Sequence, residues 1–246
     1  MVEKEFERDR LVFKPFSTLT DDEKKIIVKS WENPFNARYN KTKDANESVE
    51  KISRLAQPTF KKLEQYEDCM YFRAVFDKTT GELIGNCRFG KYYKSKTNEC
   101  WDFGFNVLLK HWLKGYGTEI IGKIIDFARG KGVKTLNGGA DIENYASYKA
   151  MINNGFEYMG YDEDGDYKYV LDLSKALKKK DDIYITWQEH LERTKTDLGE
   201  DKFNRLQNIN KKIIEMVKRI QKGEDEDVLV NRYFEALNQI ETFKFS

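Results

Sequence analysis

The chain has 246 residues, and 43 Lys plus Arg against 42 Asp plus Glu leave a formal net charge of +1. This length suits one large domain or one domain with an appendage, and the balanced charge predicts neither a nucleic-acid nor a membrane partner. Three cysteines and two histidines lack metal-ligand spacing, so we expect reduced thiols and no metal, and the charged N-terminus favours a cytoplasmic location.

The first third of the chain predicts one strand followed by helices. Residues 11–16 read as a strand that ends at Pro15. Thr20 and Glu23 have the spacing of a capping box, which predicts a helix from there to about residue 31. A second helix is expected over residues 47–66.

The middle of the chain alternates strands and helices. Aromatic and β-branched runs predict an antiparallel meander of three strands, at residues 70–77, 82–93 and 98–109. Beyond a helix that ends at Gly130-Lys-Gly132, the pattern predicts a strand at 133–136, a helix at 144–154 and a final hairpin at 160–173.

The glycine-rich stretch from Gly115 to Lys123 invites four interpretations. A nucleotide-binding P-loop is excluded, because Ile124 stands where serine or threonine would hold magnesium, and the apolar residues that follow Glu119 recur on one helical face. A dinucleotide fingerprint is excluded because its third glycine would fall at Ile120. What remains is a tight turn whose N–H groups and helix dipole form an anion cradle, or an ordinary glycine turn before a core helix.

Three motifs in register resemble the GNAT acyltransferase superfamily, in the branch of ribosomal-protein alanine N-acetyltransferases. The acetyl-CoA motif Q/R-x-x-G-x-G/A appears as Trp112-Leu-Lys-Gly115-Tyr-Gly117, with the branch's tryptophan in first place. Asp102-Phe-Gly-Phe105 lies upstream, and Asn144-Tyr-Ala-Ser147 and Gly155-Phe156 lie downstream, at matching distances. The chain departs from the branch at Leu109 (proline), Leu113 (glycine) and Asp102 (commonly glutamate).

The resemblance implies an α+β fold with a twisted, mixed sheet of about seven strands flanked by helices. It also implies that acetyl-CoA lies where the fourth and fifth strands splay apart. The residues expected to bind it are Asn106, Val107 and Leu108 on the strand, Leu113, Lys114, Gly115, Tyr116, Gly117 and Thr118 in the loop, and Asn144 on the pantetheine arm.

The implied reaction is direct transfer of an acetyl group to a neutral amine, which requires a group that accepts a proton. Asp102 is the first candidate base, Glu99 the second, and the acidic turn 162–166 the third. Ser147 is the expected donor to the departing thiolate, since Met151 occupies the place of a tyrosine used by some relatives. His111 is interpreted as a surface residue.

The sequence changes character near residue 175. We therefore predict an acetyltransferase domain at 1–174 and a helical extension at 175–246, with 178–182 as the exposed connector. Apolar stripes over 203–220 and 229–240 predict a helix hairpin. We expect it to pack on its own domain, with a homodimer contact as the alternative. The predicted function is acetyl-CoA-dependent N-acetylation of a protein N-terminus or small amine, and the alternative is a silent acyl-CoA-binding scaffold.

Overall fold

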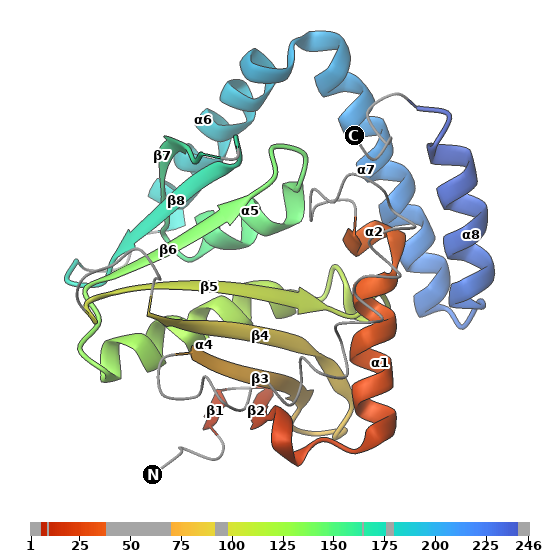
Figure 1. Cartoon of the computed structure of the whole chain (residues 1–246). Helices are drawn as coiled ribbons and strands as arrows, with labels where there is room; N and C mark the ends of the chain where they lie inside the picture. Colours follow the sequence, from red (N-terminus) through yellow and green to blue (C-terminus); the bar gives the residue numbers. More distant parts are fainter. Residues whose placement is uncertain are drawn as a thin grey trace.

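The computed structural model describes residues 6–8, 10–37, 70–91, 98–163, 165–175 and 180–240. The helix expected over 47–66 lies outside these residues. In the described part, eight strands form one sheet in the order β1-β2-β3-β4-β5-β6-β8-β7 (Figure 1). The strands are β1 (Phe6–Arg8), β2 (Leu11–Pro15), β3 (Met70–Asp77), β4 (Leu83–Lys91), β5 (Cys100–Val107), β6 (Thr135–Ala140), β7 (Glu157–Tyr161) and β8 (Tyr167–Asp172).

The sheet is mixed, as the sequence predicts. Neighbouring strands are antiparallel except for β5 and β6, which are parallel. The helix α4 (Tyr116–Gly130) connects these two strands, which is the crossover that a parallel pair requires. The short β1, which pairs with β2, adds one strand to the expected number.

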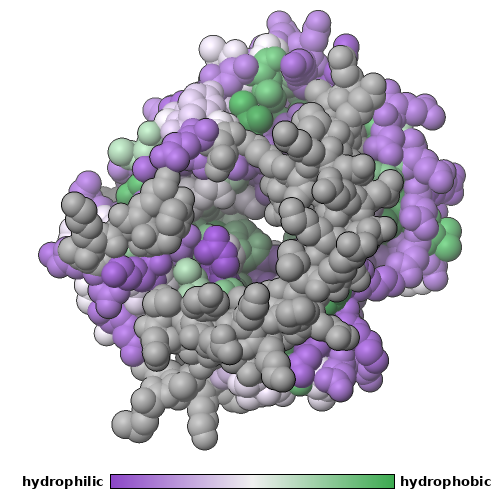
Figure 2. Space-filling model, in the orientation of Figure 1, coloured by the Kyte–Doolittle hydropathy of each residue, from purple (hydrophilic) through white to green (hydrophobic). Residues whose placement is uncertain are grey.

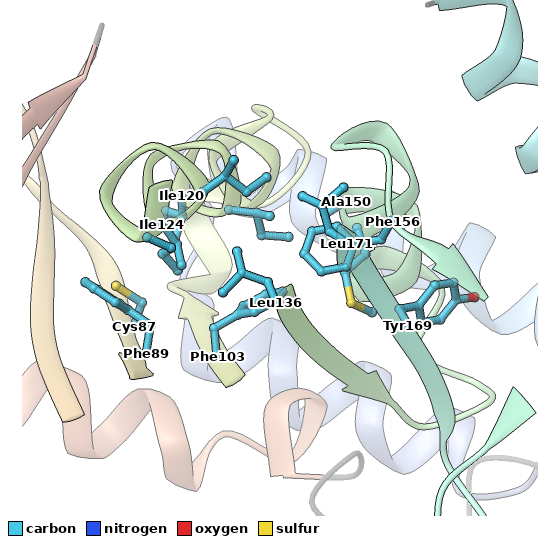
Figure 3. Close-up of a cluster of buried hydrophobic side chains, with 14 of the residues drawn as sticks. Cys87, Phe89, Phe103, Ile120, Ile124, Leu136, Ala150, Phe156, Tyr169 and Leu171 are labelled. Carbon is cyan, nitrogen blue, oxygen red and sulfur yellow. The ribbon is translucent and has the colours of Figure 1, made fainter. Parts of the chain in front are cut away.

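One face of the sheet is covered by α4 and by α5 (Tyr145–Asn153), and the main core lies between them and the strands. Figure 3 shows Ile120 and Ile124 of α4 above Phe89 and Phe103 of the sheet. Ile120 and Ile124 are fully buried, so the predicted apolar face of α4 is confirmed. Burying such side chains contributes about 1.5–3 kcal/mol each.

The opposite face of the sheet carries α1 (Asp21–Glu32) and a smaller core. The capping box that the sequence predicts is present, with Glu23 N–H donating to Thr20 and the Glu23 carboxylate accepting from Thr20 N–H. Ile27 packs with Ala74 and Phe76, whereas the intervening Val75 belongs to the main core. This alternation follows from the two-residue period of a strand.

Three helices follow the sheet: α6 (Lys180–Leu198), α7 (Glu200–Gln221) and α8 (Glu226–Leu237). The connector expected at 178–182 is thus partly helical, since α6 begins at Lys180. Trp187 of α6 packs against the main core, where the ring of Tyr145 lies edge-on to it. None of the helices in the described ranges is both long and apolar enough to cross a bilayer.

The predicted hairpin is formed by α7 and α8, and its apolar stripes are buried on the chain itself. They share a core with Phe35 of the short helix α2 (Pro34–Ala37) and Leu109 of the short 3-10 helix η3 (Leu109–His111). Lys29 of α1 also pairs with Asp227 of α8 at 2.7 Å. The hairpin therefore packs on the preceding part of the chain, which is the arrangement preferred from the sequence.

Candidate functional site

The parallel strands β5 and β6 separate along their length and leave a wedge between them. They pair at only three positions, Cys100 with Thr135, Trp101 with Leu136 and Asp102 with Asn137. Beyond these pairs the two strands diverge (Figure 1), and the same region is hollowed in the space-filling view (Figure 2). The main-chain groups that β5 turns toward β6 beyond Asp102 therefore have no strand partner in the described part of the chain.

Strand alternation decides which of these groups face the wedge. Leu108 N–H donates to Ile84 O at 2.9 Å, so Leu108 turns its main-chain groups toward β4. Asn106, two residues earlier, does the same because antiparallel partners alternate. Val107 faces the wedge, but its carbonyl already accepts a hydrogen bond from the Trp112 indole at 2.8 Å. Of the three strand residues predicted to bind acetyl-CoA through their backbone, only Val107 thus presents main-chain groups to the wedge.

The loop at the wide end of the wedge is a tight turn into α4. Leu113 has φ +64° and is the non-glycine residue with positive φ in the described ranges. Gly115 follows at φ +81° as the N-cap of α4, and it supplies no side-chain cap. A left-handed conformation costs an ordinary residue about 1–2 kcal/mol. Glycine, which the branch named in the sequence analysis carries at the matching place, would avoid this cost, whereas this chain forms the turn with leucine.

The first turn of α4 presents unpaired N–H groups toward the loop. The N–H groups of Tyr116, Gly117 and Thr118 have no hydrogen-bond acceptor among the described residues, and the first such bond is Glu119 N–H to Gly115 O. The first N–H groups of any helix lack acceptors within the helix, and the helix dipole adds partial positive charge beside them. This arrangement suits an anionic group.

Gly117 lets α4 approach the sheet closely. A Cβ built there would lie 3.0 Å from Cε2 of Phe105 and 3.9 Å from Cβ of Ala150. The glycine therefore sets the position of the helix N-terminus over β5, whatever the loop binds.

Arg10, which the sequence analysis did not select, holds the loop from the N-terminal side. Its Nε donates to Glu119 at 2.9 Å, its Nη2 donates to Lys114 O at 3.1 Å, and its guanidinium lies 4.4 Å from the centre of the Tyr116 ring. The hydrogen bond with Glu119 raises the pKa of Arg10. Arg10 is separated from Lys114 by more than a hundred residues, so sequence spacing gave no signal for it.

His111 is not the surface residue that the sequence analysis expected. It is 3% exposed, and its ring lies edge-on to Tyr116 with 5.8 Å between ring centroids. Burial lowers its pKa, so the ring is neutral at pH 7. The His111 side chain is therefore part of the buried packing that supports the start of α4.

Asp102 lies where the wedge begins, at the last paired position of β5. Its side chain is on the face opposite α4, because Trp101 and Phe103 on either side of it belong to the main core. Arg88 Nη1 donates to Asp102 Oδ2 at 3.2 Å, and Oδ1 is buried without a partner among the described residues. Oδ1 is therefore the carboxylate oxygen that has no donor in the described part of the chain, and it is shielded from solvent.

The other two candidate bases lie in different surroundings. Glu99 precedes β5, outside the wedge, and forms an ion pair with Lys134 at 2.6 Å. In the acidic turn, Asp162 Oδ1 accepts from Asp166 N–H at 2.9 Å, which stabilises the turn itself. Of the three candidates, Asp102 is the one on the strand beside the opening.

Asn144 and Ser147 are linked to each other. Asn144 is the N-cap of α5, and its side-chain oxygen accepts the N–H of Ser147 at 3.2 Å. This leaves the amide nitrogen of Asn144 and the hydroxyl of Ser147 as the polar atoms for a ligand. Met151 is 2% exposed and packs in the main core, so its place offers no donor.

A separate cavity of about 190 Å³ lies between β7, α5 and α6. Its lining includes Glu157, Tyr158, His190 and Arg193, and none of the predicted site residues. His190 is 1% exposed, with Nδ1 2.8 Å from Tyr169 Oη and Nε2 3.2 Å from Thr194 Oγ1, and burial lowers its pKa to about 4. The wedge and the cavity are thus distinct features.

Comparison with known proteins identifies the family of the chain. The family model for the GNAT acetyltransferase domain matches residues 10–157, which is more than half of the chain. The chain therefore belongs to the GNAT acetyltransferase family. An uncharacterised N-acetyltransferase from Bacillus licheniformis is 25% identical over 113 residues, 46% of this chain and 58% of that protein.

Solved structures share the fold. A spermidine N-acetyltransferase from Vibrio cholerae in complex with CoA and spermine has a TM-score of 0.53 at 15% identity, covering 68% of this chain and 98% of that one. A ribosomal-protein-S5-alanine acetyltransferase from Vibrio fischeri has a TM-score of 0.51 at 12% identity, covering 70% and 98%. These chains are matched almost entirely, whereas α6–α8 of this chain follow the last residue of the family match.

Proposed function

We propose that this protein is an acetyl-CoA-dependent N-acetyltransferase that uses the β5–β6 wedge. The observation that supports this most is the position of the wedge, which opens beside the unpaired N–H groups at the start of α4. The N–H groups at the start of α4 suit a pyrophosphate, and the wedge between β5 and β6 suits an extended pantetheine arm.

The residues present fit acetyl-CoA. The N–H groups of Leu113 to Thr118 are proposed to hold the pyrophosphate, with Arg10 and Lys114 adding positive charge at its edge. Val107 is proposed to meet the pantetheine arm on the strand side and Asn144 on the side of α5. When bound, acetyl-CoA supplies the acetyl group as a reactive thioester.

Asp102 is proposed to accept the proton of the amine, directly or through water. Most amines are protonated at pH 7, so a proton must leave the nitrogen for it to attack, and a carboxylate beside the acceptor can take that proton as a general base. Arg88 donates to Oδ2 of Asp102, so Oδ1, which has no donor within the described ranges, is proposed as the oxygen that accepts the proton. Ser147 is proposed to donate to the departing thiolate. The acceptor is proposed to be a protein N-terminus or a small-molecule amine.

Two measurements test this function on the full chain. CoA should raise the melting temperature, because a ligand that binds only the folded state stabilises it, and magnesium-ATP should raise it less. Release of free thiol from acetyl-CoA should then depend on an added amine from a panel of peptides and small amines. Binding of CoA without thiol release for any amine would favour the silent scaffold instead. The absence of CoA binding would refute the proposal.

A further inference from the structure

The helical extension contacts the segment that precedes α4, and part of this contact is with the backbone carbonyls of that segment. Gln221, the last residue of α7, donates from Nε2 to Trp112 O at 2.8 Å and lies 3.4 Å from Lys110 O. Leu109 and Trp112 also pack in the core formed by α7 and α8. The extension therefore contacts the segment 109–112 through both apolar and polar groups.

Trp112 is fixed at three points. Its backbone N–H donates to Leu109 O at 3.1 Å, its indole donates to Val107 O at 2.8 Å, and its carbonyl accepts from Gln221. The carbonyl of Trp112 and the N–H of Leu113 belong to one trans peptide plane, so they point in opposite directions. By holding the carbonyl toward α7, Gln221 turns the Leu113 N–H away from α7.

The backbone of Leu113 is in an unfavourable conformation, which contacts with other parts of the chain must stabilise. Leu113 follows at φ +64°, a conformation that a leucine adopts only when its surroundings enforce it. Upstream, η3 is a single short turn, and downstream Gly115 offers no side-chain cap. The contacts that enforce the turn at Trp112 thus come partly from the far end of the chain.

We propose that Gln221 and the α7–α8 hairpin position the 113–118 loop for CoA binding, so that the extension acts as a brace for the site. This inference rests on the proposed function for its ligand, but the brace itself is a property of the free protein. Gln221 is a positioning residue, since it touches the loop backbone and acts through it.

The experiment compares three full-length variants. Gln221→Ala removes the donor, and Gln221→Glu places a carboxylate against two carbonyl oxygens and cannot donate when ionised. Asn208→Ala is the matched control, because Asn208 is an exposed amide on the same helix whose side chain makes no hydrogen bond with the described residues. Gln221 is exposed, so both of its variants should fold.

Two readouts decide the inference. Hydrogen exchange over residues 109–118 should be faster in Gln221→Ala than in the wild type, with β3 and β4 unchanged. The KM for acetyl-CoA and the Kd for CoA should rise about twofold to tenfold, as for one lost hydrogen bond, while kcat at saturating acetyl-CoA stays within about twofold. Gln221→Glu should show larger effects, and Asn208→Ala should behave as the wild type.

Unchanged exchange over 109–118 together with unchanged CoA affinity in Gln221→Ala would overturn the inference. Equal effects of Gln221→Ala and Asn208→Ala would also overturn it, because the contact with Trp112 would then be irrelevant. A wild type that binds no CoA would refute the proposed function, whereas the exchange measurement would still decide whether the extension braces the loop.

Discussion

Replacing Gly117 with alanine tests whether the seating of α4 on β5 sets CoA affinity. The new Cβ would lie 3.0 Å from Cε2 of Phe105, closer than nearly all real contacts, so either the ring or the helix start must shift by a few tenths of an ångström. Such overpacking costs about 1–3 kcal/mol. Alanine regains about 0.4–1 kcal/mol by restricting the unfolded chain. The expected net loss is on the order of 1 kcal/mol, or roughly 2–4 °C in melting temperature for a chain of this size.

The matched control is Gly130→Ala in the last turn of the same helix. A Cβ there meets no atom within 4 Å, and Gly130 lacks a positive φ. The same substitution should therefore be neutral or raise stability by up to about 1 kcal/mol.

Thermal melts of both variants with and without CoA separate the two effects. A ligand at a hundredfold its Kd stabilises a protein by about 2.7 kcal/mol. We expect that increment to shrink in Gly117→Ala, because the N–H groups of the first turn move with the helix, and to persist in Gly130→Ala. Gly117→Asp, which adds a negative charge beside the same donors, should abolish it. A full CoA increment in Gly117→Ala, with the intrinsic melting temperature lowered as expected, would refute the link between helix seating and CoA binding.

Other substitutions have equally definite outcomes. Asp102→Asn should lower kcat by about 10²-fold and leave the KM for acetyl-CoA unchanged in the thiol-release assay, and unchanged turnover across pH would reassign the base. Leu113→Gly should keep or raise the melting temperature, because relief of the left-handed strain offsets the entropy of glycine, and a clear loss would show that the leucine side chain is itself needed. A chain that ends at Ser174 should be less stable and less soluble by calorimetry and light scattering, because it uncovers the apolar surfaces that α6–α8 cover, and unchanged values would show an independent module. Burial lowers the pKa of His190 to about 4 in the folded state, against about 6.5 when unfolded, so the unfolded state takes up a proton first and stability should fall as pH drops from 6.5 toward 4. His190→Gln should flatten that decline in urea unfolding measured at several pH values, and an unchanged slope would contradict this assignment.

Local patterns in the sequence determined most of the elements and one complete motif. The capping box at Thr20, the strand at 70–77 and the apolar face of α4 lie where the sequence predicts them. The spacing of Trp112, Gly115 and Gly117 also indicated the family. Such features depend on neighbours within a few residues, so the order of residues alone carries them.

The site required contacts between residues far apart in the chain. Arg10 reaches Lys114 and Arg88 reaches Asp102 because the sheet and α4 fold together, and Gln221 reaches Trp112 because the extension packs on the segment that precedes α4. The direction of main-chain groups on β5 depends on its register with β4, and one residue of register would exchange the two edges. The burial of His111 likewise depends on how the turn packs under Tyr116. Sequence fixes local conformation through local forces, whereas these contacts are decided by how distant segments pack and pair, which no spacing along the chain encodes.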